Sequence, residues 1–225
     1  MHPAASPRAS AGFVGRLLSF GVAVPVLYFA VQIAAAPFYP GYSFFSRDAS
    51  TLGSAGSSAP WIFNLGALAL GVIQMAVAGA FAIALPQAGV GRALSALTAT
   101  ALLSSGLASL NAFLHPLPDP RHSTGWLAML GTGFVLLPLL SAMVLWRLGR
   151  RRSALVIVVA CVMLLPLMTG LPQRLCIHAG LECAGYQFFL NNYHGLIQRC
   201  GAALLFVPIG VIALILRRSG PGVRF

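Results

Sequence analysis

The stretch WIFNLGALALGVIQMAVAGAFAIAL, residues 61–85, decides the fold class of this chain. It contains no charged residue, and its only strongly polar side chains are those of Asn64 and Gln74. A helix needs about 20 consecutive apolar residues to cross the hydrocarbon core of a bilayer, and this run is longer. The stretch therefore predicts a membrane-spanning helix.

Similar apolar runs lie on both sides of it, at 17–36, 93–114, 126–146, 154–171 and 196–216. The whole chain is 58% hydrophobic and 8% charged, whereas a soluble domain has about 25% charged residues. A mean hydropathy of +0.87 agrees with this assignment. We expect a single all-α integral membrane domain over residues 1–225, a bundle of six transmembrane helices, with flexible tails at 1–12 and 219–225. The small residues Ala34–Ala36 resemble a cleavage site, but the long first run favours a retained helix over a signal peptide.

The distribution of arginine predicts the orientation. All 14 basic residues are arginines, and most lie in alternate loops that also include the two chain ends. All three acids, Asp48, Asp119 and Glu182, lie in the other loops. Positively charged loops stay in the cytoplasm, so both termini are predicted to be cytoplasmic and the acidic loops to face outward. We expect a multi-pass protein of a bacterial cytoplasmic (inner) membrane, and the positive charge indicates contact with anionic head groups, not nucleic acid.

Small residues at helical spacing predict the centre of the bundle. Runs 61–85 and 93–114 each have such a face, because close packing drives helix association in lipid. The two faces are formed by Ala67, Gly71, Ala78 and Ala82, and by Ser95, Thr98, Ser105, Gly106 and Ser109.

Polar residues within the apolar runs gather near the outer loops. They are predicted to form an outward-facing ligand pocket lined by Asp48, Asn64, Asn111, His115, Asp119, His194 and Arg199. Arg199 is the most informative of them, because it lies inside an otherwise apolar run. It can extend to the interface, pair with one of the acids, or bind an anionic head group. The competing interpretation is that these residues anchor helix ends or bond neighbouring helices.

Metal binding and common enzyme chemistry find little support. The outer histidines and acids lack a metal-binding spacing, so we predict no metal and no cofactor. No Gly-x-Ser-x-Gly elbow and no phosphate-binding loop with lysine occurs. The three acids, Asp48, Asp119 and Glu182, remain candidates for general acid catalysis. Cys176 and Cys183 flank the last outer loop, where an oxidising compartment favours a disulfide between them.

Four segments resemble a known family of prokaryotic membrane proteins. They are SRDASTLG at 46–53, PWIFNLG at 60–66 with Gly71, HPLPDP at 115–120 with Thr124 and Gly125, and GLIQR at 195–199. This pattern is similar to the family catalogued as domain of unknown function nine-nine-eight, itself distantly similar to the DRAM-like membrane proteins. Thr51 and Ala128 stand where that family has an acid and a histidine. The resemblance implies six helices and a polar site on the outer face, without an established activity.

Three functions follow from these observations. The first is binding of a membrane lipid or small amphiphile in the outer pocket, either alone or as part of transport. The second is a membrane-embedded enzyme that acts on a lipid or isoprenoid through carboxylate acid–base chemistry. The third is an accessory subunit of a membrane complex, or a homo-oligomer, whose small-residue faces dock a partner helix. Whether the protein is an enzyme is left open.

Overall fold

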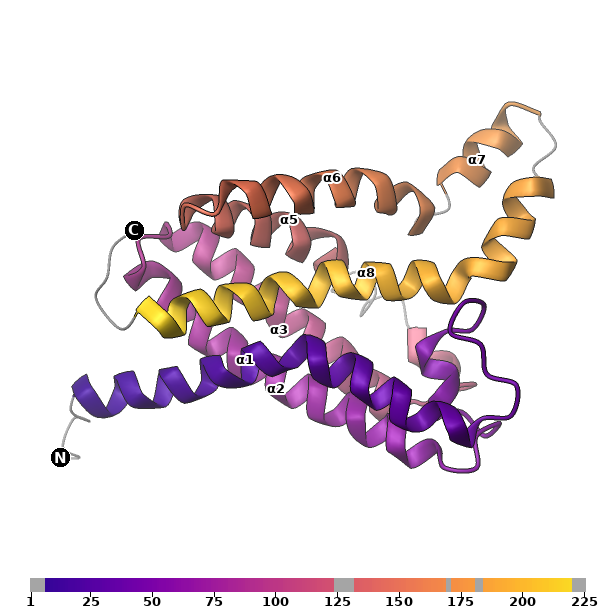
Figure 1. The fold of residues 1–225 in the computed structure, drawn as a ribbon, viewed down its shortest axis with the longest axis horizontal. Coiled ribbons are helices and arrows are strands. Elements are labelled where there is room, and N and C mark those ends of the chain that lie inside the picture. Colours follow the sequence, from indigo (N-terminus) through magenta and orange to yellow (C-terminus); the bar gives the residue numbers. More distant parts are fainter. Residues whose placement is uncertain (1–6, 124–131, 169–170, 181–183, 220–225) are drawn as a thin grey trace.

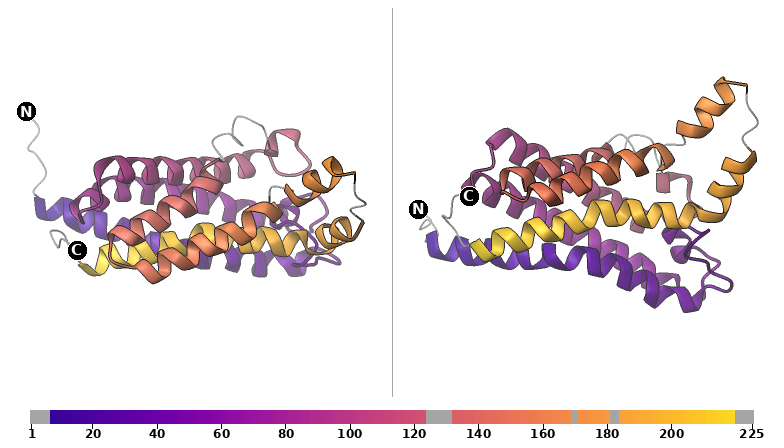
Figure 2. Two further views of the ribbon diagram at one scale, coloured as in Figure 1. Left: turned by 90° about the horizontal axis from the view of Figure 1, so that it is seen from above. Right: turned by 45° about the horizontal axis from the view of Figure 1, so that its top comes forward.

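The computed structural model is all-α and describes residues 7–123, 132–168, 171–180 and 184–219 (Figure 1). Within these ranges seven α-helices and three short 3-10 helices occur. The α-helices are α1 (Pro7–Ala35), α2 (Pro60–Gln87), α3 (Arg92–Leu114), α5 (Thr132–Arg147), α6 (Arg151–Met168), α7 (Leu171–His178) and α8 (Ala184–Ser219). The 3-10 helices are η1 (Ala36–Phe38), η2 (Ala49–Gly53) and η3 (Pro120–Ser123). All long helices run nearly along one axis of an elongated bundle (Figures 1 and 2).

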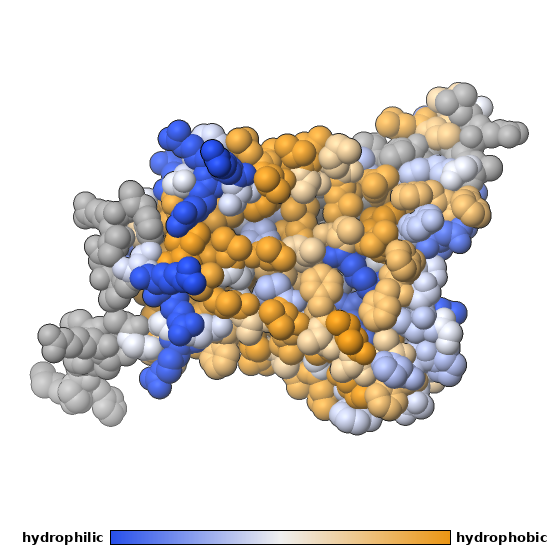
Figure 3. All heavy atoms as spheres, viewed as in Figure 1, coloured by the Kyte–Doolittle hydropathy of each residue, from blue (hydrophilic) through white to orange (hydrophobic). Residues whose placement is uncertain are grey.

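Four helical segments are long and apolar enough to cross a membrane: Gly12–Phe38, Pro60–Gln87, Arg92–Leu114 and Gly185–Ser219. A shorter apolar helix covers Leu136–Arg147. These segments support an integral membrane protein that crosses the bilayer several times. In the space-filling view a broad apolar belt separates the two polar ends of the molecule (Figure 3).

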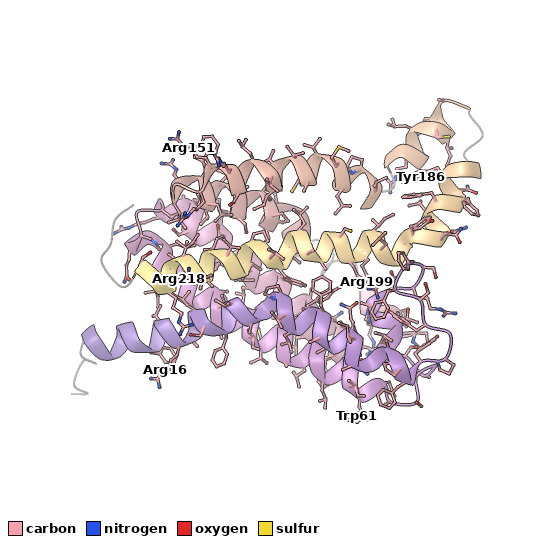
Figure 4. All side chains as sticks on the ribbon, in the orientation of Figure 1. Arg16, Trp61, Arg151, Tyr186, Arg199 and Arg218 are labelled. Carbon is pink, nitrogen blue, oxygen red and sulfur yellow. The ribbon has the colours of Figure 1, made fainter. Side chains whose placement is uncertain are left out.

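The two ends of the bundle differ in charge. Arg16, Arg151 and Arg218 lie at one end, which we call the basic end (Figure 4). Trp61, Tyr186 and Arg199 lie toward the opposite end, which we call the loop end, because the 3-10 helices and their connecting segments gather there (Figures 1 and 4). The uneven distribution of arginine along the sequence therefore corresponds to two ends of the bundle that differ in charge.

Tight turns join the helices at the basic end. Gly89 and Gly149 follow α2 and α5 with φ of 85° and 74°, which lies in the left-handed region that favours glycine. The next amides, of Val90 and Arg150, donate to the carbonyls of Leu85 and Leu145 at 3.0 and 2.8 Å. These bonds satisfy carbonyls that a helix end leaves unpaired, so each helix reverses direction within a few residues.

The predicted small-residue faces meet between α2 and α3. A Cβ atom added at Gly71 would lie 2.8 Å from the Gly106 carbonyl oxygen, and one at Gly106 would lie 2.9 Å from the Gly71 carbonyl oxygen. The two backbones are therefore in direct contact. Ala78 is buried in agreement with the prediction, whereas Ala82 is exposed. Gly71 and Gly106 pack within this chain and are covered by one another.

The bundle is densest toward the basic end. Most of its largest fully buried side chains lie on the halves of their helices nearest that end, among them Phe81, Leu85, Leu145, Ile209 and Ile212. Toward the loop end the helices diverge and irregular segments fill the space between them (Figure 1). Any internal cavity is therefore expected in the loop-end half, where packing is loosest.

Several element boundaries differ from the sequence expectation. Helix α1 begins at Pro7, ten residues before the start of the predicted span at residue 17. Helix α8 begins at Ala184, and α7 occupies Leu171–His178, where the sequence predicted one continuous loop. At about 1.5 Å per residue α8 is much longer than a membrane span requires, so its first turns project past the loop end. The first turns of α8 could not be recognised in the sequence, because Gln187 and Asn191 interrupt the apolar pattern that identifies a membrane span.

Candidate functional site

A segment of the first connection closes the loop end of the bundle. We call residues 42–53, which include η2, the roof segment. It packs against the part of α8 that begins at His194, more than a hundred residues later in the chain. The Leu196 amide donates to the Phe45 carbonyl at 2.9 Å, and the Ala49 amide donates to the Gln198 side-chain oxygen at 2.7 Å.

Arg199 forms the centre of this contact. Its side chain is buried, with 8% relative exposure. One terminal nitrogen, Nη1, donates to the carbonyl oxygens of Phe44, Arg47 and Gly195 at 2.8, 2.9 and 2.8 Å. The guanidinium carbon also lies 5.0 Å from the Phe44 ring centre, within the range of cation–π attraction. The side chain therefore binds the roof segment through backbone atoms and an aromatic ring.

Tyr42 extends the same network. Its hydroxyl accepts a bond from Nη2 of Arg199 and donates to the Asp48 carbonyl oxygen at 3.0 Å. Burial raises the pKa of the Tyr42 hydroxyl, and the nearby Arg199 charge partly opposes that rise. The hydroxyl is therefore neutral near pH 7 and acts as both donor and acceptor.

Asp48 and His194 complete the junction. His194 Nδ1 lies 2.8 Å from Asp48 Oδ1, and both side chains are partly exposed to solvent. Gly195 allows the close approach, because a Cβ atom there would lie 2.9 Å from the Arg47 amide nitrogen and nearer still to its carbonyl oxygen. Four of the residues that contact the roof segment, His194, Gly195, Gln198 and Arg199, thus lie within less than two turns of α8.

Asn64 and Asn111 each hold a connecting segment. Asn64 on α2 donates to the Gly53 carbonyl at 3.1 Å, which fixes the end of η2. Asn111 on α3 donates to the carbonyls of Arg121 and His122 at 2.9 and 3.3 Å, which fixes η3. Both amides therefore act where the sequence placed them, at the loop-end turns of their helices, and both bind backbone.

The second connection has its own ion pair. Asp119 accepts bonds from Nε and Nη2 of Arg121 at 3.0 and 2.7 Å, and His115 lies 3.6 Å away. The Arg121 side chain holds the pKa of the partly exposed Asp119 carboxyl well below its usual range. His122 Nδ1 contacts the His115 carbonyl oxygen at 2.7 Å, which joins η3 to the residue that follows α3.

Beneath these two connections lies a cavity of about 310 Å³, which we call the chamber. Its volume falls at the lower end of the range for small-molecule sites in proteins. Helices α1, α2, α3, α5 and α8 form its walls, together with residues of η2 and η3. Most of its wall is apolar, with Tyr28, Ser50, Ser109, His122 and Gln198 as the polar lining residues. The chamber is therefore suited to an apolar or amphiphilic molecule.

The structure places the residues predicted to line a pocket at contacts of the loop end. Among the described residues that line it, none of Asp48, Asn64, Asn111, His115, Asp119, His194 and Arg199 occurs. The structure brings Asp48, His194 and Arg199 together at the roof, and Asn111, His115 and Asp119 together at η3. Glu182 lies outside the described residues. The lining residues Gln198 and His122 were visible as polar residues near the outer loops, whereas Tyr28 and Ser50 carried no distinguishing signal.

Metal ligands and cysteines add no second site in the described part of the chain. There, no three His, Cys, Asp or Glu side chains gather closely enough to hold a metal ion. Cys161 and Cys200 are free thiols. Cys183 lies outside the described residues, so its disulfide with Cys176 stays a prediction.

Comparisons with protein families, with curated proteins and with solved structures find no match to this chain. The resemblance carried by the four short segments therefore stays a prediction.

Proposed function

We propose that this protein binds a membrane lipid or a small amphiphile in the chamber. The observation that carries the proposal is an apolar cavity of about 310 Å³ within the loop-end half of a membrane-type helix bundle. Five helices and two connecting segments converge on it, and the roof segment is held in place by a buried arginine. The chamber wall is mostly apolar, so an apolar group fits it better than water does.

The proposal includes the topology that the sequence indicates. Helices α1, α2, α3, α5, α6 and α8 would each cross the bacterial cytoplasmic membrane, with the basic end in the cytoplasm. Supporting this, Arg16, Arg151 and Arg218 gather at one end of the bundle (Figure 4). The chamber would then lie in the outer half of the membrane. The resemblance to the family of unknown function, with its six helices and outer polar site, is compatible with this arrangement.

Catalysis by Asp48 or Asp119 is a weaker alternative on this geometry. Asp48 is paired with His194, and Asp119 is paired with Arg121. Neither carboxylate lies among the described residues that line the chamber. The accessory-subunit alternative loses its proposed docking faces, because Gly71 and Gly106 pack against one another.

Mass spectrometry of the gently purified protein tests the binding function. We expect a defined lipid or amphiphile at constant stoichiometry with the wild-type protein. Ala202→Trp fills the chamber from α8 and should remove that molecule, whereas Val207→Trp, on an exposed face of the same helix, should retain it. Only bulk lipid in bulk proportions, with no difference between the two variants, would contradict the proposal.

A further inference from the structure

The polar residues that line the chamber gather mainly at one end of it. They are Tyr28, Ser50, Ser109, His122 and Gln198. Ser50 belongs to the roof segment, His122 belongs to η3, and Gln198 lies on α8 where this helix contacts the roof segment. These three residues lie at the loop end, and we call this side of the chamber its outer end.

The inner end of the chamber, toward the basic end of the bundle, is apolar. Helices α2 and α8 both run from the loop end toward the basic end. Leu70 therefore lies deeper than Phe63, and Leu204 and Phe206 lie deeper than Gln198. The eight residues from Gln198 to Phe206 correspond to about 12 Å along α8. The lining thus changes from polar to hydrocarbon over the length of a short alkyl chain.

Tyr28 and Ser109 leave this gradient in place. The Ser109 hydroxyl donates to the Ser105 carbonyl of its own helix at 3.2 Å, so its proton is already engaged. The Tyr28 ring centre lies 4.9 Å from that of Phe206, and its hydroxyl lies beside the Gln32 side chain, one helical turn nearer the loop end. Tyr28 therefore presents its ring to the inner end and directs its hydroxyl toward the roof segment.

Gln198 supplies a hydrogen-bond donor at the outer end. Its side-chain oxygen accepts the Ala49 amide at 2.7 Å, and because a backbone amide only donates, this bond fixes which side-chain atom is the oxygen. Among the described residues the NH₂ group of Gln198 has no hydrogen-bond partner. One half of the carboxamide thus holds the roof segment, and the other half is available to a ligand.

His122 and Ser50 add an acceptor and a second donor. His122 Nδ1 lies 2.7 Å from the His115 carbonyl oxygen, which only accepts, so Nδ1 carries the proton and Nε2 of the neutral ring is an acceptor. The Ser50 hydroxyl, which can donate and accept, has no hydrogen-bond partner in the described part of the chain. The outer end therefore offers both kinds of hydrogen-bonding group.

The lining carries no formal charge. Among the described residues that line the chamber no aspartate, glutamate, lysine or arginine occurs. Arg199 is the neighbour of Gln198, but its terminal nitrogens donate to roof-segment carbonyls and to Tyr42. Burying an ionised group without a counter-charge is far more costly than burying a hydroxyl. The outer end is therefore suited to a neutral group that accepts from Gln198 and donates to His122.

We infer that the chamber binds an amphiphile with a neutral, hydroxyl-bearing polar group, held under the roof segment by Ser50, His122 and Gln198. Its hydrocarbon chain points toward the basic end. This inference rests on the proposed binding function and adds the ligand's chemical class and orientation. With the proposed topology, the orientation is that of a lipid in the outer leaflet, whose polar group lies outermost. Such a molecule can enter the chamber without inverting.

Three probes with the same chain test the chemical class: decanol, decyl methyl ether and decanoate. The full-length protein is washed in detergent to release bound lipid and transferred to an amphipol, so that no detergent competes for the chamber. Affinities are measured from the shift of the thermal unfolding midpoint with probe concentration. Decanol should bind about fivefold or more tightly than the ether, because only the alcohol donates a hydrogen bond.

Ser50→Ala removes a hydroxyl that the fold does not use. It should weaken decanol binding about threefold to tenfold and leave the midpoint of the probe-free protein unchanged. Ser46→Ala is the matched control, because Ser46 also belongs to the roof segment but does not line the chamber. It should change neither quantity. An unchanged decanol affinity in Ser50→Ala would overturn the inference.

His122→Asn separates the two nitrogens of the ring. An asparagine amide places an N–H near the position of Nδ1, so the contact with the His115 carbonyl can persist while the Nε2 acceptor is removed. The variant should lose most of the preference for decanol over the ether. A preference as large as in the wild-type protein would show that the alcohol donates elsewhere, and would overturn the inference.

Photo-crosslinking tests the orientation independently of affinity. A decanol with a diazirine at the far end of its chain should label the inner end, at residues such as Leu70 and Leu204. Labelling of Ala49 or Ser50 by this probe would mean that the chain points toward the roof segment, which is the reverse of the inferred orientation.

The remaining outcomes distinguish this inference from the proposed function. If all three probes bind equally tightly, or decanoate binds best, amphiphile binding is retained and the inference fails. If no probe shifts the wild-type protein, and Ala202→Trp retains the same lipids as Val207→Trp, the proposed function and the inference fail together.

Discussion

The guanidinium of Arg199 donates to the backbone carbonyl of Arg47, 152 residues earlier in the chain, at 2.9 Å. It also donates to the carbonyl of Phe44, and both acceptors belong to the roof segment. A buried guanidinium is stable here because carbonyl oxygens replace part of its hydration. Arg199 thus joins the first connection to the last helix, and it holds Ala49 and Ser50 over the chamber.

Replacing Arg199 should open the roof segment. In a Ser50→Cys background, Arg199→Leu should increase the labelling rate of the new cysteine by about tenfold or more, because hydrogen bonds to a charged group contribute about 1.5–3 kcal/mol. Arg199→Lys should have a smaller effect, since an ammonium bonds fewer of the carbonyls. The rate is measured with a membrane-impermeant maleimide and corrected for the native cysteines.

Arg47→Leu is the matched control for this experiment. It also removes an arginine side chain at the roof, but the Arg47 side chain is exposed and its carbonyl remains available to Arg199. Its labelling rate should stay close to that of the parent. Equal rates in the parent and in Arg199→Leu would show that the roof segment stays closed without the guanidinium.

Gly195→Ala should separate the roof segment from α8. An added Cβ would lie 2.9 Å from the Arg47 amide nitrogen, and backbone atoms can move aside only by shifting the segment. We expect a destabilisation of about 1–3 kcal/mol, measured as a lower thermal unfolding midpoint in detergent. Gly185→Ala on the same helix meets no neighbouring atom and should leave the midpoint unchanged or slightly higher. Equal midpoints for the two variants would contradict the close contact.

Gly71→Ala should weaken the packing of α2 against α3. The added methyl group would lie 2.8 Å from the Gly106 carbonyl oxygen and 3.1 Å from the Leu110 amide nitrogen. The expected loss is about 1–3 kcal/mol, because two helix backbones have to move apart. Gly79→Ala, also on α2 but with open space around it, provides the comparison. Thermal unfolding of both proteins checks the prediction, which fails if Gly79→Ala is the less stable of the two.

The Asp119–Arg121 pair should show a defined pH response. Since Arg121 lowers the pKa of the folded Asp119 carboxyl, the pair's contribution is complete above the ordinary aspartate value of about 4. It is lost as the pH falls through the lowered pKa. Arg121→Gln should return that pKa toward about 4, which carboxyl carbon NMR can follow. The chain has only three acids, and Asp48→Asn assigns the signals.

An Asp119 signal that titrates at the ordinary value in the wild-type protein would show that the ion pair does not persist in solution. The measurement needs no ligand. It therefore tests the geometry of the second connection separately from any proposal on function.

Several features of the site could be predicted from the sequence. Asn64 and Asn111 stood out because an amide within an apolar run has to find a partner, and each does so at a nearby connection. Arg199 stood out for the same reason. From its position in the sequence, Arg199 could pair with an acid, bind a head group or reach the interface, and the structure shows that it binds backbone carbonyls. Carbonyl acceptors occur at every residue, so no sequence pattern distinguishes the ones that are used.

The location of the chamber could not be predicted. Its wall combines small and apolar residues such as Gly66, Ala67 and Ala202 with Tyr28, and these look like ordinary packing residues. Whether such residues enclose a cavity depends on how far the helices diverge toward the loop end.

The sequence by itself determined the all-α membrane class, the division into a basic end and a loop end, and the close approach of α2 and α3. Hydropathy, charge and residue size are local properties, and they act through the bilayer or between neighbouring helices. The tertiary structure alone decided that the roof segment docks on α8, that Asp48 pairs with His194 and Asp119 with Arg121, and that a mostly apolar chamber lies beneath them. These features join residues far apart in the chain, and their partners are backbone atoms or enclosed space that no single stretch of sequence specifies.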